Sequence, residues 1–153
     1  MDDENVLTIH RTLAASRDRV WRACTEPSTL AKWWGLPKGA SMPVVEVDLC
    51  VGGSFHFKVD LPDGTSLWFK SIYREIVDGQ KLILESHLSD ENGNIVDTAD
   101  MPVSMITLLF EDSGARTELT VIHEGMTSAA HQIDQYKEGW SQSLDRLTGS
   151  LIN

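Results

Sequence analysis

The C-terminal segment from Thr127 to Leu151 constrains the fold more than any other stretch of the sequence. Its apolar residues recur at spacings of three and four, which places them within an arc of roughly 80° on one helical face. They are Ile133, Tyr136, Trp140, Leu144, Leu147 and Leu151, and the opposite face carries Gln135, Glu138, Gln142, Asp145 and Arg146. An amphipathic helix is stable only when its apolar stripe is covered, so the rest of the chain has to supply the cover.

The segments before this helix show the alternation and the turn signals of β-strands. We expect strands over residues 5–13, 44–49, 54–61, 65–77, 81–89, 103–111 and 116–124. Pro62-Asp63-Gly64 and Asp78-Gly79 predict hairpin turns, and Gly52-Gly53 predicts a turn or a bulge. Residues 36–41 and 90–101 are expected to be loops.

Two short helices are predicted between the first strand and the second. Ser16 has the side chain of an N-cap for a helix over residues 17–25, and Pro27 suits the first position of the next helix. Gly35 provides the stop of that second helix, and Thr127 is the expected cap of the long C-terminal helix.

This order of elements lacks a βαβ crossover, so it predicts an α+β protein with an antiparallel sheet. Strands joined by hairpins twist enough to curl, and the long helix then lies across the concave side. A helix touches a curved sheet along a line only, so a cavity is expected between them. No linker or repeat divides the chain, and we expect one domain over residues 1–153.

Charge and cysteine content narrow the class of protein. The net charge of −10, without a basic cluster, disfavours binding to nucleic acid or to an anionic membrane. Cys24 and Cys50 are expected to be buried free thiols, as in a reducing cytosol, with a redox pair as the alternative. The start Met1-Asp2-Asp3-Glu4 lacks the features of a signal peptide, and no apolar run is long enough to span a membrane. A cytoplasmic protein is therefore expected.

Short motifs spread from the first helix to the end of the chain are similar to those of a known family. They are Val20-Trp21, Trp33-Trp34-Gly35, Asp48-Leu49 before Gly52-Gly53, Pro62-Asp63-Gly64, Tyr73-Arg74-Glu75-Ile76, Lys81-Leu82-Ile83, Thr117-Glu118-Leu119-Thr120 with His123, and Gly139-Trp140 with Leu144 and Leu147. Together they resemble the SRPBCC superfamily, also called START-like or Bet v-like, in the branch similar to the C-terminal domain of the activator of the heat-shock-protein-90 ATPase.

The resemblance implies a helix-grip fold, in which a curved antiparallel sheet of about seven strands and two short helices surround a long C-terminal helix. Relatives with this fold bind lipids, hormones and polyketides, so the resemblance suggests an apolar small molecule as the partner. Ser71 departs from the glycine that many members carry before the Tyr73 run, and we expect it to narrow the cavity locally.

The residues expected to line the cavity are apolar or aromatic side chains of inward strand parity, together with aromatic residues of the helices. They are Trp33, Trp34, Phe55, Phe57, Phe69, Tyr73, Leu84, Ile106, Leu108, Leu119, Val121, His123, Tyr136 and Trp140. Each tryptophan could instead be plain core, and of Trp68 and Phe69 one faces in and the other out. Gly139 in mid-helix indicates either room for a ligand or tight packing against the sheet.

The histidines do not form a recognisable metal motif. His10, His56, His87, His123 and His131 include no pair spaced by three or four residues, so neither a metal nor another cofactor is predicted. His123 shares strand parity with Leu119 and Val121 and should point inward, either as a structural histidine or as a group that meets a ligand. Glu85 and His87 share a strand face, which is either a polar patch or simply a solvated side.

Binding of an apolar small molecule in the cavity is the favoured function. An enzyme is the alternative, a cyclase or hydrolase that uses His123, Tyr73 or Glu85 as acid–base groups, although the sequence has no nucleophile motif or phosphate loop. A chaperone-associated protein–protein module is the third hypothesis and would require an exposed apolar patch. Weak homodimerisation is common for such sheets, but no residue argues for it here.

Overall fold

The computed structural model describes residues 6–35, 39–98, 102–125 and 130–151, with the backbone alone for residues 130–133. Its centre is a seven-stranded antiparallel sheet in the order β1-β7-β6-β5-β4-β3-β2, which confirms the predicted sheet. The strands are β1 (Val6–Leu13), β2 (Ser41–Val47), β3 (Ser54–Asp60), β4 (Ser66–Val77), β5 (Lys81–Ser89), β6 (Ser104–Ser113) and β7 (Arg116–Glu124). From β2 to β7 each strand pairs with the next, and β1 pairs with β7.

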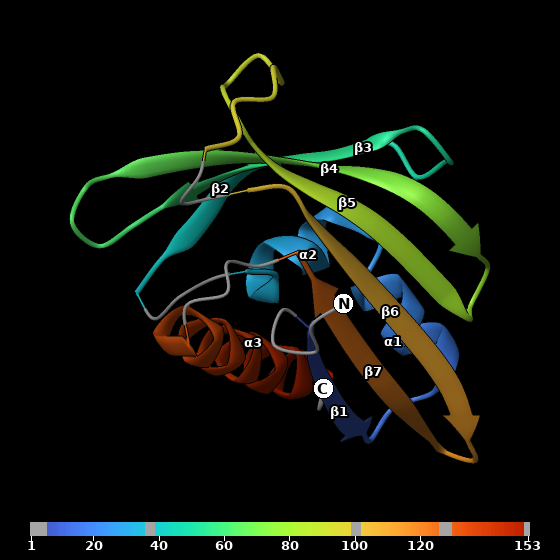
Figure 1. Cartoon of the computed structure of the whole chain (residues 1–153). Helices are drawn as coiled ribbons and strands as arrows, with labels where there is room; N and C mark the ends of the chain where they lie inside the picture. Colours follow the sequence, from blue (N-terminus) through green and yellow to red (C-terminus); the bar gives the residue numbers. More distant parts are fainter. Residues whose placement is uncertain (1–5, 36–38, 99–101, 126–129, 152–153) are drawn as a thin grey trace.

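The sheet curls so that its concave face looks toward the helices (Figure 1). Burial alternates along the strands, as the period of two requires for a sheet with one covered face. On β3, Phe55, Phe57 and Val59 are buried, while the residues between them are only partly covered. On β7 the buried positions include Val121 and His123. The inward parity predicted for His123 is therefore confirmed.

Two short helices follow β1, as predicted. They are α1 (Arg17–Ala23) and α2 (Pro27–Trp33). Ser16 caps α1, because its hydroxyl accepts a hydrogen bond from the backbone N–H of Arg19 at 3.3 Å. Pro27 occupies the start of α2, and Gly35 follows the end of α2 with a φ of 58°, a conformation that glycine adopts without strain.

The long helix α3 (Ala130–Ser150) lies across the concave side of the sheet (Figure 1). Trp140, Leu144, Leu147 and the following Leu151 are buried, and Tyr136 is half-buried, so this part of the predicted stripe does face the sheet. The side chain of Ile133 and the cap expected at Thr127 lie outside the described residues.

Two hydrogen bonds of arginines hold the end of α3 in place. Arg11 on β1 donates to Asp145 Oδ1 at 2.8 Å, and Arg19 on α1 donates to the carbonyl oxygen of Leu151 at 2.8 Å. The second of these connects α1 to the residue that follows α3.

The Gly52-Gly53 pair forms a tight connection between β2 and β3. Gly52 N–H donates to the carbonyl of Tyr73 at 2.8 Å, and Tyr73 N–H donates to the carbonyl of Gly53 at 3.0 Å. A Cβ atom on Gly53 would lie 2.3 Å from the carbonyl oxygen of Asp48, so only glycine fits at this position.

The prediction that both cysteines are buried is wrong for one of them. Cys24, the C-cap residue of α1, is buried, and burial raises the pKa of its thiol. Cys50 is exposed, because it lies in the turn between β2 and β3, where its thiol faces Asp48 at 3.5 Å. Both thiols are free.

Candidate functional site

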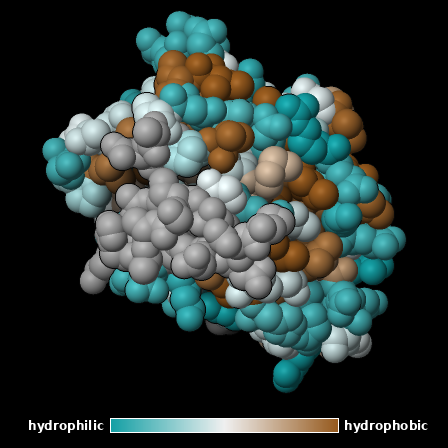
Figure 2. Space-filling view, in the orientation of Figure 1, coloured by the Kyte–Doolittle hydropathy of each residue, from teal (hydrophilic) through white to brown (hydrophobic). Residues whose placement is uncertain are grey.

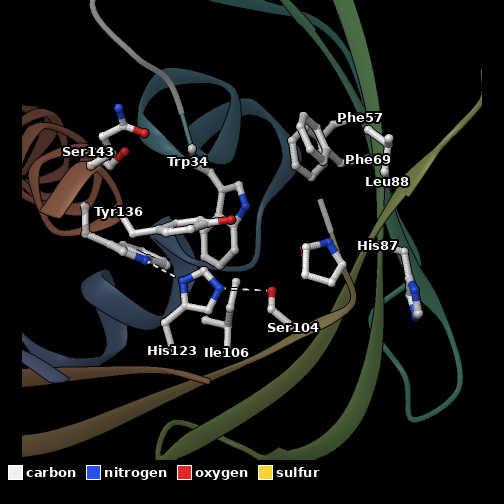
Figure 3. Close-up of a pocket in the computed structure, with 16 residues that line it drawn as sticks. Trp34, Phe57, Phe69, His87, Leu88, Ser104, Ile106, His123, Tyr136 and Ser143 are labelled. Atoms are coloured by element: carbon white, nitrogen blue, oxygen red, sulfur yellow. Dashed lines mark hydrogen bonds between the residues drawn. The ribbon is translucent and has the colours of Figure 1, made fainter. Parts of the chain in front are cut away.

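A cavity of about 450 Å³ lies between the concave face of the sheet and α3 (Figure 3). Pockets for small molecules commonly span about 300–1,000 Å³ and combine apolar walls with a few polar groups. The lining residues come from the two positions after α2, from the strands, from the segment before β6 and from α3: Trp34, Gly35, Phe57, Phe69, Ser86, His87, Leu88, Pro102, Ser104, Ile106, His123, Gln135, Tyr136, Gly139, Trp140 and Ser143.

Aromatic rings form two sides of this cavity. On the sheet, the rings of Phe57 and Phe69 are stacked with their centroids 5.3 Å apart. On the helical side, the rings of Trp34 and Trp140 meet edge to face at 5.6 Å, which ties the end of α2 to α3. Such contacts fix the ring positions, so these walls are preorganised for a flat or apolar ligand.

A chain of polar groups crosses the cavity wall at His123. The indole N–H of Trp140 donates to His123 Nδ1 at 3.0 Å, and His123 Nε2 lies 2.9 Å from Ser104 Oγ (Figure 3). The ring of Tyr136 stands edge-on to the imidazole, with centroids 5.2 Å apart. Both ring nitrogens of His123 therefore have a partner within the protein.

Burial determines the protonation state of His123. The imidazole is almost fully covered, and this desolvation lowers its pKa to about 4. At neutral pH the ring is uncharged. The cavity thus has polar groups but no charge at this wall.

Half of the predicted site residues line the cavity and half do not. Those that line it are Trp34, Phe57, Phe69, Ile106, His123, Tyr136 and Trp140. The others are buried in the packed part of the core: Trp33, Phe55, Tyr73, Leu84, Leu108, Leu119 and Val121. Trp33 illustrates why, because its indole N–H donates to the carbonyl of Ala23 at 2.9 Å and so joins α2 to α1.

Several lining residues were not predicted. Ser86 and Leu88 continue the inward parity of Leu84 along β5, so the alternation contained the signal that could have identified them. Gln135 belongs to the polar face of α3, yet it borders the cavity from an exposed position. Ser104 likewise shares the inward parity of Ile106 and Leu108 along β6. Pro102 and Ser143 had no distinguishing pattern in the sequence.

Gly139 faces the cavity rather than the sheet. A Cβ atom at this position would meet no described atom within 4 Å. Tight packing against the sheet, one of the two explanations for a mid-helix glycine, is therefore excluded for the described residues. The space beside Gly139 belongs to the cavity.

Two inward hydroxyl groups of β4 lie outside the cavity wall. Ser71 Oγ and Tyr73 Oη are buried, and neither has a hydrogen-bond partner in the described part of the chain. Burial also raises the pKa of Tyr73. Ser71 does not line the cavity, so its side chain does not narrow the cavity as the sequence led us to expect. Trp68, on the opposite parity, stacks on His56 with ring centroids 5.0 Å apart.

Glu85 and His87 belong to a charged cluster on the outer face of the sheet. The imidazole of His87 points away from the other labelled side chains (Figure 3) and lies between Glu85 and Asp97, with its Nδ1 2.7 Å from Asp97 Oδ2. Burial alone would lower the pKa of His87, but the hydrogen bonds to Asp97 and Glu85 outweigh it and raise the pKa. Arg74 also pairs with Glu85, at 3.0 Å.

The described part of the chain offers neither a metal-binding cluster nor a helix for a bilayer. Among the side chains that the structure describes, no group of three or more His, Cys, Asp or Glu has an arrangement that could hold a metal ion. None of the described helices has the length and apolar character needed to cross a membrane.

A curved antiparallel sheet closed by a C-terminal helix, with a cavity between them, defines a helix-grip protein. The sequence profile of the family described as Activator of Hsp90 ATPase homolog 1-like protein matches residues 14–151, and the chain belongs to this family. The resemblance seen in the sequence is thereby confirmed.

Solved structures of bacterial proteins agree with this assignment. A protein from Chromobacterium violaceum is 27% identical with a TM-score of 0.82, and the match covers 97% of this chain and 98% of that one. A protein from Nitrosomonas europaea has the same identity and TM-score over 97% and 95% of the two chains. An AHSA1-like protein from Aeromonas hydrophila, at 19% identity, shares the fold with a TM-score of 0.71 over 93% and 90%. No curated protein matches the chain.

Proposed function

We propose that this protein binds a small, mostly apolar molecule in the cavity between the sheet and α3. The observation that carries the proposal is the cavity itself, about 450 Å³ in volume and bordered by Trp34, Phe57, Phe69 and Trp140. Burial of apolar ligand surface against such walls would supply the binding free energy. The net charge of −10 also supports a ligand other than nucleic acid.

Binding is favoured over catalysis by the positions of the candidate acid–base groups. His123 lines the cavity, whereas Tyr73 lies in the core beside it and Glu85 belongs to the outer cluster. Of the three, only His123 would meet a ligand in this cavity. Both of its ring nitrogens are already engaged, by Trp140 and Ser104.

The chaperone alternative, suggested by the family description, would use the outer surface instead. The exposed large apolar side chains of the described residues occur in separate stretches of the chain: Leu49, Val51, Val77, Ile95, Val96 and Val103. In the view of Figure 2, hydrophobic residues appear in several groups separated by hydrophilic ones. This pattern gives less support to a docking surface than the cavity gives to a ligand.

The two free thiols suggest that the protein works in a reducing compartment such as the cytoplasm.

A thermal-stability screen against a library of neutral apolar compounds tests the proposal. A ligand present at a hundred times its Kd should add about 2.7 kcal/mol to the free energy of unfolding and raise Tm accordingly. Gly139→Leu should fill the space beside α3 and abolish the shift. Gly149→Leu, on an exposed part of the same helix, is the matched control and should keep it. A library without any stabilising compound, or a shift that survives Gly139→Leu unchanged, would contradict the proposal.

A further inference from the structure

The hydrogen bonds from Trp140 through His123 to Ser104 have one possible direction. An indole nitrogen can only donate, so His123 Nδ1 must accept the hydrogen bond from Trp140. A neutral imidazole carries a single ring hydrogen, which is then on Nε2. His123 Nε2–H therefore donates to Ser104 Oγ across 2.9 Å.

This direction leaves the hydroxyl hydrogen of Ser104 without a partner among the residues that the structure describes. Its oxygen accepts from His123, and within the described residues the side chain makes no second hydrogen bond. Ser104 is half-buried and lines the cavity, so its O–H is available to a bound molecule (Figure 3). An unsatisfied hydroxyl hydrogen is costly when a ligand covers it, so a ligand that supplies an acceptor is preferred there.

The remaining wall gives a ligand no counter-charge. Among the lining residues of the described chain there is no lysine, arginine, aspartate or glutamate. His87 contributes to the wall, but its imidazole is engaged with Glu85 and Asp97 on the outer face. A charged ligand would lose its hydration in this cavity without gaining an ionic partner.

Building on the proposed binding function, we propose that the ligand is uncharged and mostly apolar and carries an oxygen acceptor, such as the carbonyl of a ketone, ester or lactone, that accepts a hydrogen bond from Ser104 Oγ–H. Ser104 is then the group that contacts the ligand. Trp140 and His123 are positioning residues, because they orient the hydroxyl without needing to touch the acceptor. Burial of His123 keeps its ring neutral, which preserves the direction of these hydrogen bonds.

Three naphthalenes of nearly the same shape test this inference by isothermal titration calorimetry. They are 2-acetylnaphthalene with a carbonyl oxygen, 2-isopropenylnaphthalene with a CH₂ group in its place, and 2-naphthoate with a carboxylate. The wild-type protein should bind the ketone about three- to tenfold more tightly than the alkene, which corresponds to one hydrogen bond. It should bind the carboxylate more weakly than the ketone.

Three variants test whether the hydrogen bonds from Trp140 through His123 to Ser104 cause the preference for the ketone. Ser104→Ala should equalise the Kd values of ketone and alkene without weakening alkene binding. Ser113→Ala, which removes an exposed hydroxyl at the other end of β6 and away from the cavity, is the matched control and should keep the preference. Trp140→Phe removes the indole N–H, so His123 can carry its hydrogen on Nδ1 and accept a hydrogen bond from Ser104 Oγ–H. The hydroxyl is then no longer available to the ligand, and the ratio of ketone to alkene affinity should fall.

The outcomes separate this inference from the function on which it rests. Equal binding of ketone and alkene by the wild-type protein, or a ketone preference that survives Ser104→Ala, would overturn the role of Ser104 while leaving cavity binding intact. Binding of 2-naphthoate at least as tight as that of the ketone would overturn the uncharged class. If neither neutral compound binds up to its solubility limit, the binding function itself is contradicted.

Discussion

At the scale of single residues, His123 is a buried polar side chain in the wall of the cavity. Its side chain is buried, with the residue 5% exposed, which leaves the imidazole dependent on Trp140 and Ser104 for its hydrogen bonds. A buried polar group whose bonds are all made is tolerated and holds its neighbours in a single arrangement. The rotamers of Trp140 and Ser104 are thus coupled through one ring.

Protonation of His123 should destabilise the protein at low pH. The pKa of this ring is lowered to about 4 in the folded chain by burial, whereas its ordinary value is 6.5. The unfolded chain therefore binds the proton more tightly, and stability is lost as pH falls from about 6.5 to about 4. The loss attributable to this one group approaches about 3 kcal/mol.

Urea unfolding at pH 7, 5.5 and 4.5, for the wild type and for His123→Gln, measures this loss. Glutamine can accept from Trp140 and donate to Ser104 but does not titrate in this range. The free energy of unfolding should fall more steeply with decreasing pH for the wild type than for the variant. His87 has a raised pKa and the opposite dependence, but it is present in both proteins and cancels in the difference. Equal slopes would show that His123 is not buried neutral.

Sequence patterns located the inward faces of the strands but not the cavity along them. The period of two identified His123, Ile106 and Leu108 as inward, and each is buried. Which of these side chains borders the void depends on the distance between sheet and helix at each point, and no local pattern encodes that distance. Ser104 shares the inward parity of Ile106 and Leu108 on β6 but was missed, since a serine has no apolar signature.

At the scale of elements, α3 combines a packed end and an open end. Leu144 and Leu147 are fully buried, whereas Gly139 and Tyr136 border the cavity. The helix could be predicted from its periodicity because that pattern repeats over many turns. The start of β2 and the end of β6 were less accurately placed, since strand ends depend on pairing with neighbouring strands rather than on the residues themselves.

Gly139→Ala should stabilise the protein. A methyl group at this position meets no described atom within 4 Å, and alanine is favoured over glycine inside a helix by roughly 0.5–1 kcal/mol. We expect an increase of that size in the free energy of unfolding, measured by urea denaturation. The midpoint temperature should rise as well.

Gly149→Ala is the internal reference for this gain. A Cβ atom on Gly149 would also have no described atom within 4 Å, but this residue does not line the cavity. Both variants should therefore be more stable than the wild type, and only the one at Gly139 should alter the Kd of a cavity ligand. A loss of stability in Gly139→Ala would mean that the helix packs closely at this point.

At the scale of the whole molecule, the interior between sheet and helices is divided into a packed region and a hollow one. The packed region lies beside α1, where Val20, Leu119 and Leu147 are fully buried. The hollow region lies between strands β3 to β7 and residues 135–143 of α3, lined by Phe57, Phe69 and Tyr136 among others. One sheet serves both regions because it curves away from α3 toward β3 (Figure 1).

Neighbouring inward positions of β6 allow this division to be measured. Leu108 is fully buried in the packed region, and Ile106, two residues earlier on the same face, lines the cavity. Truncation to alanine removes transfer free energy at both sites, but it creates a new void only where packed neighbours surround the lost atoms. Leu108→Ala should therefore lower the free energy of unfolding in urea by about 2–5 kcal/mol, and Ile106→Ala should lower it distinctly less.

Ile106→Ala should also enlarge the cavity and improve the binding of bulkier apolar compounds relative to the wild type. Leu108→Ala should leave the order of ligand affinities unchanged. If both variants lost the same stability and neither changed the ligand preference, the interior would be packed as tightly around Ile106 as around Leu108. The proposed binding site would then lack the space it requires.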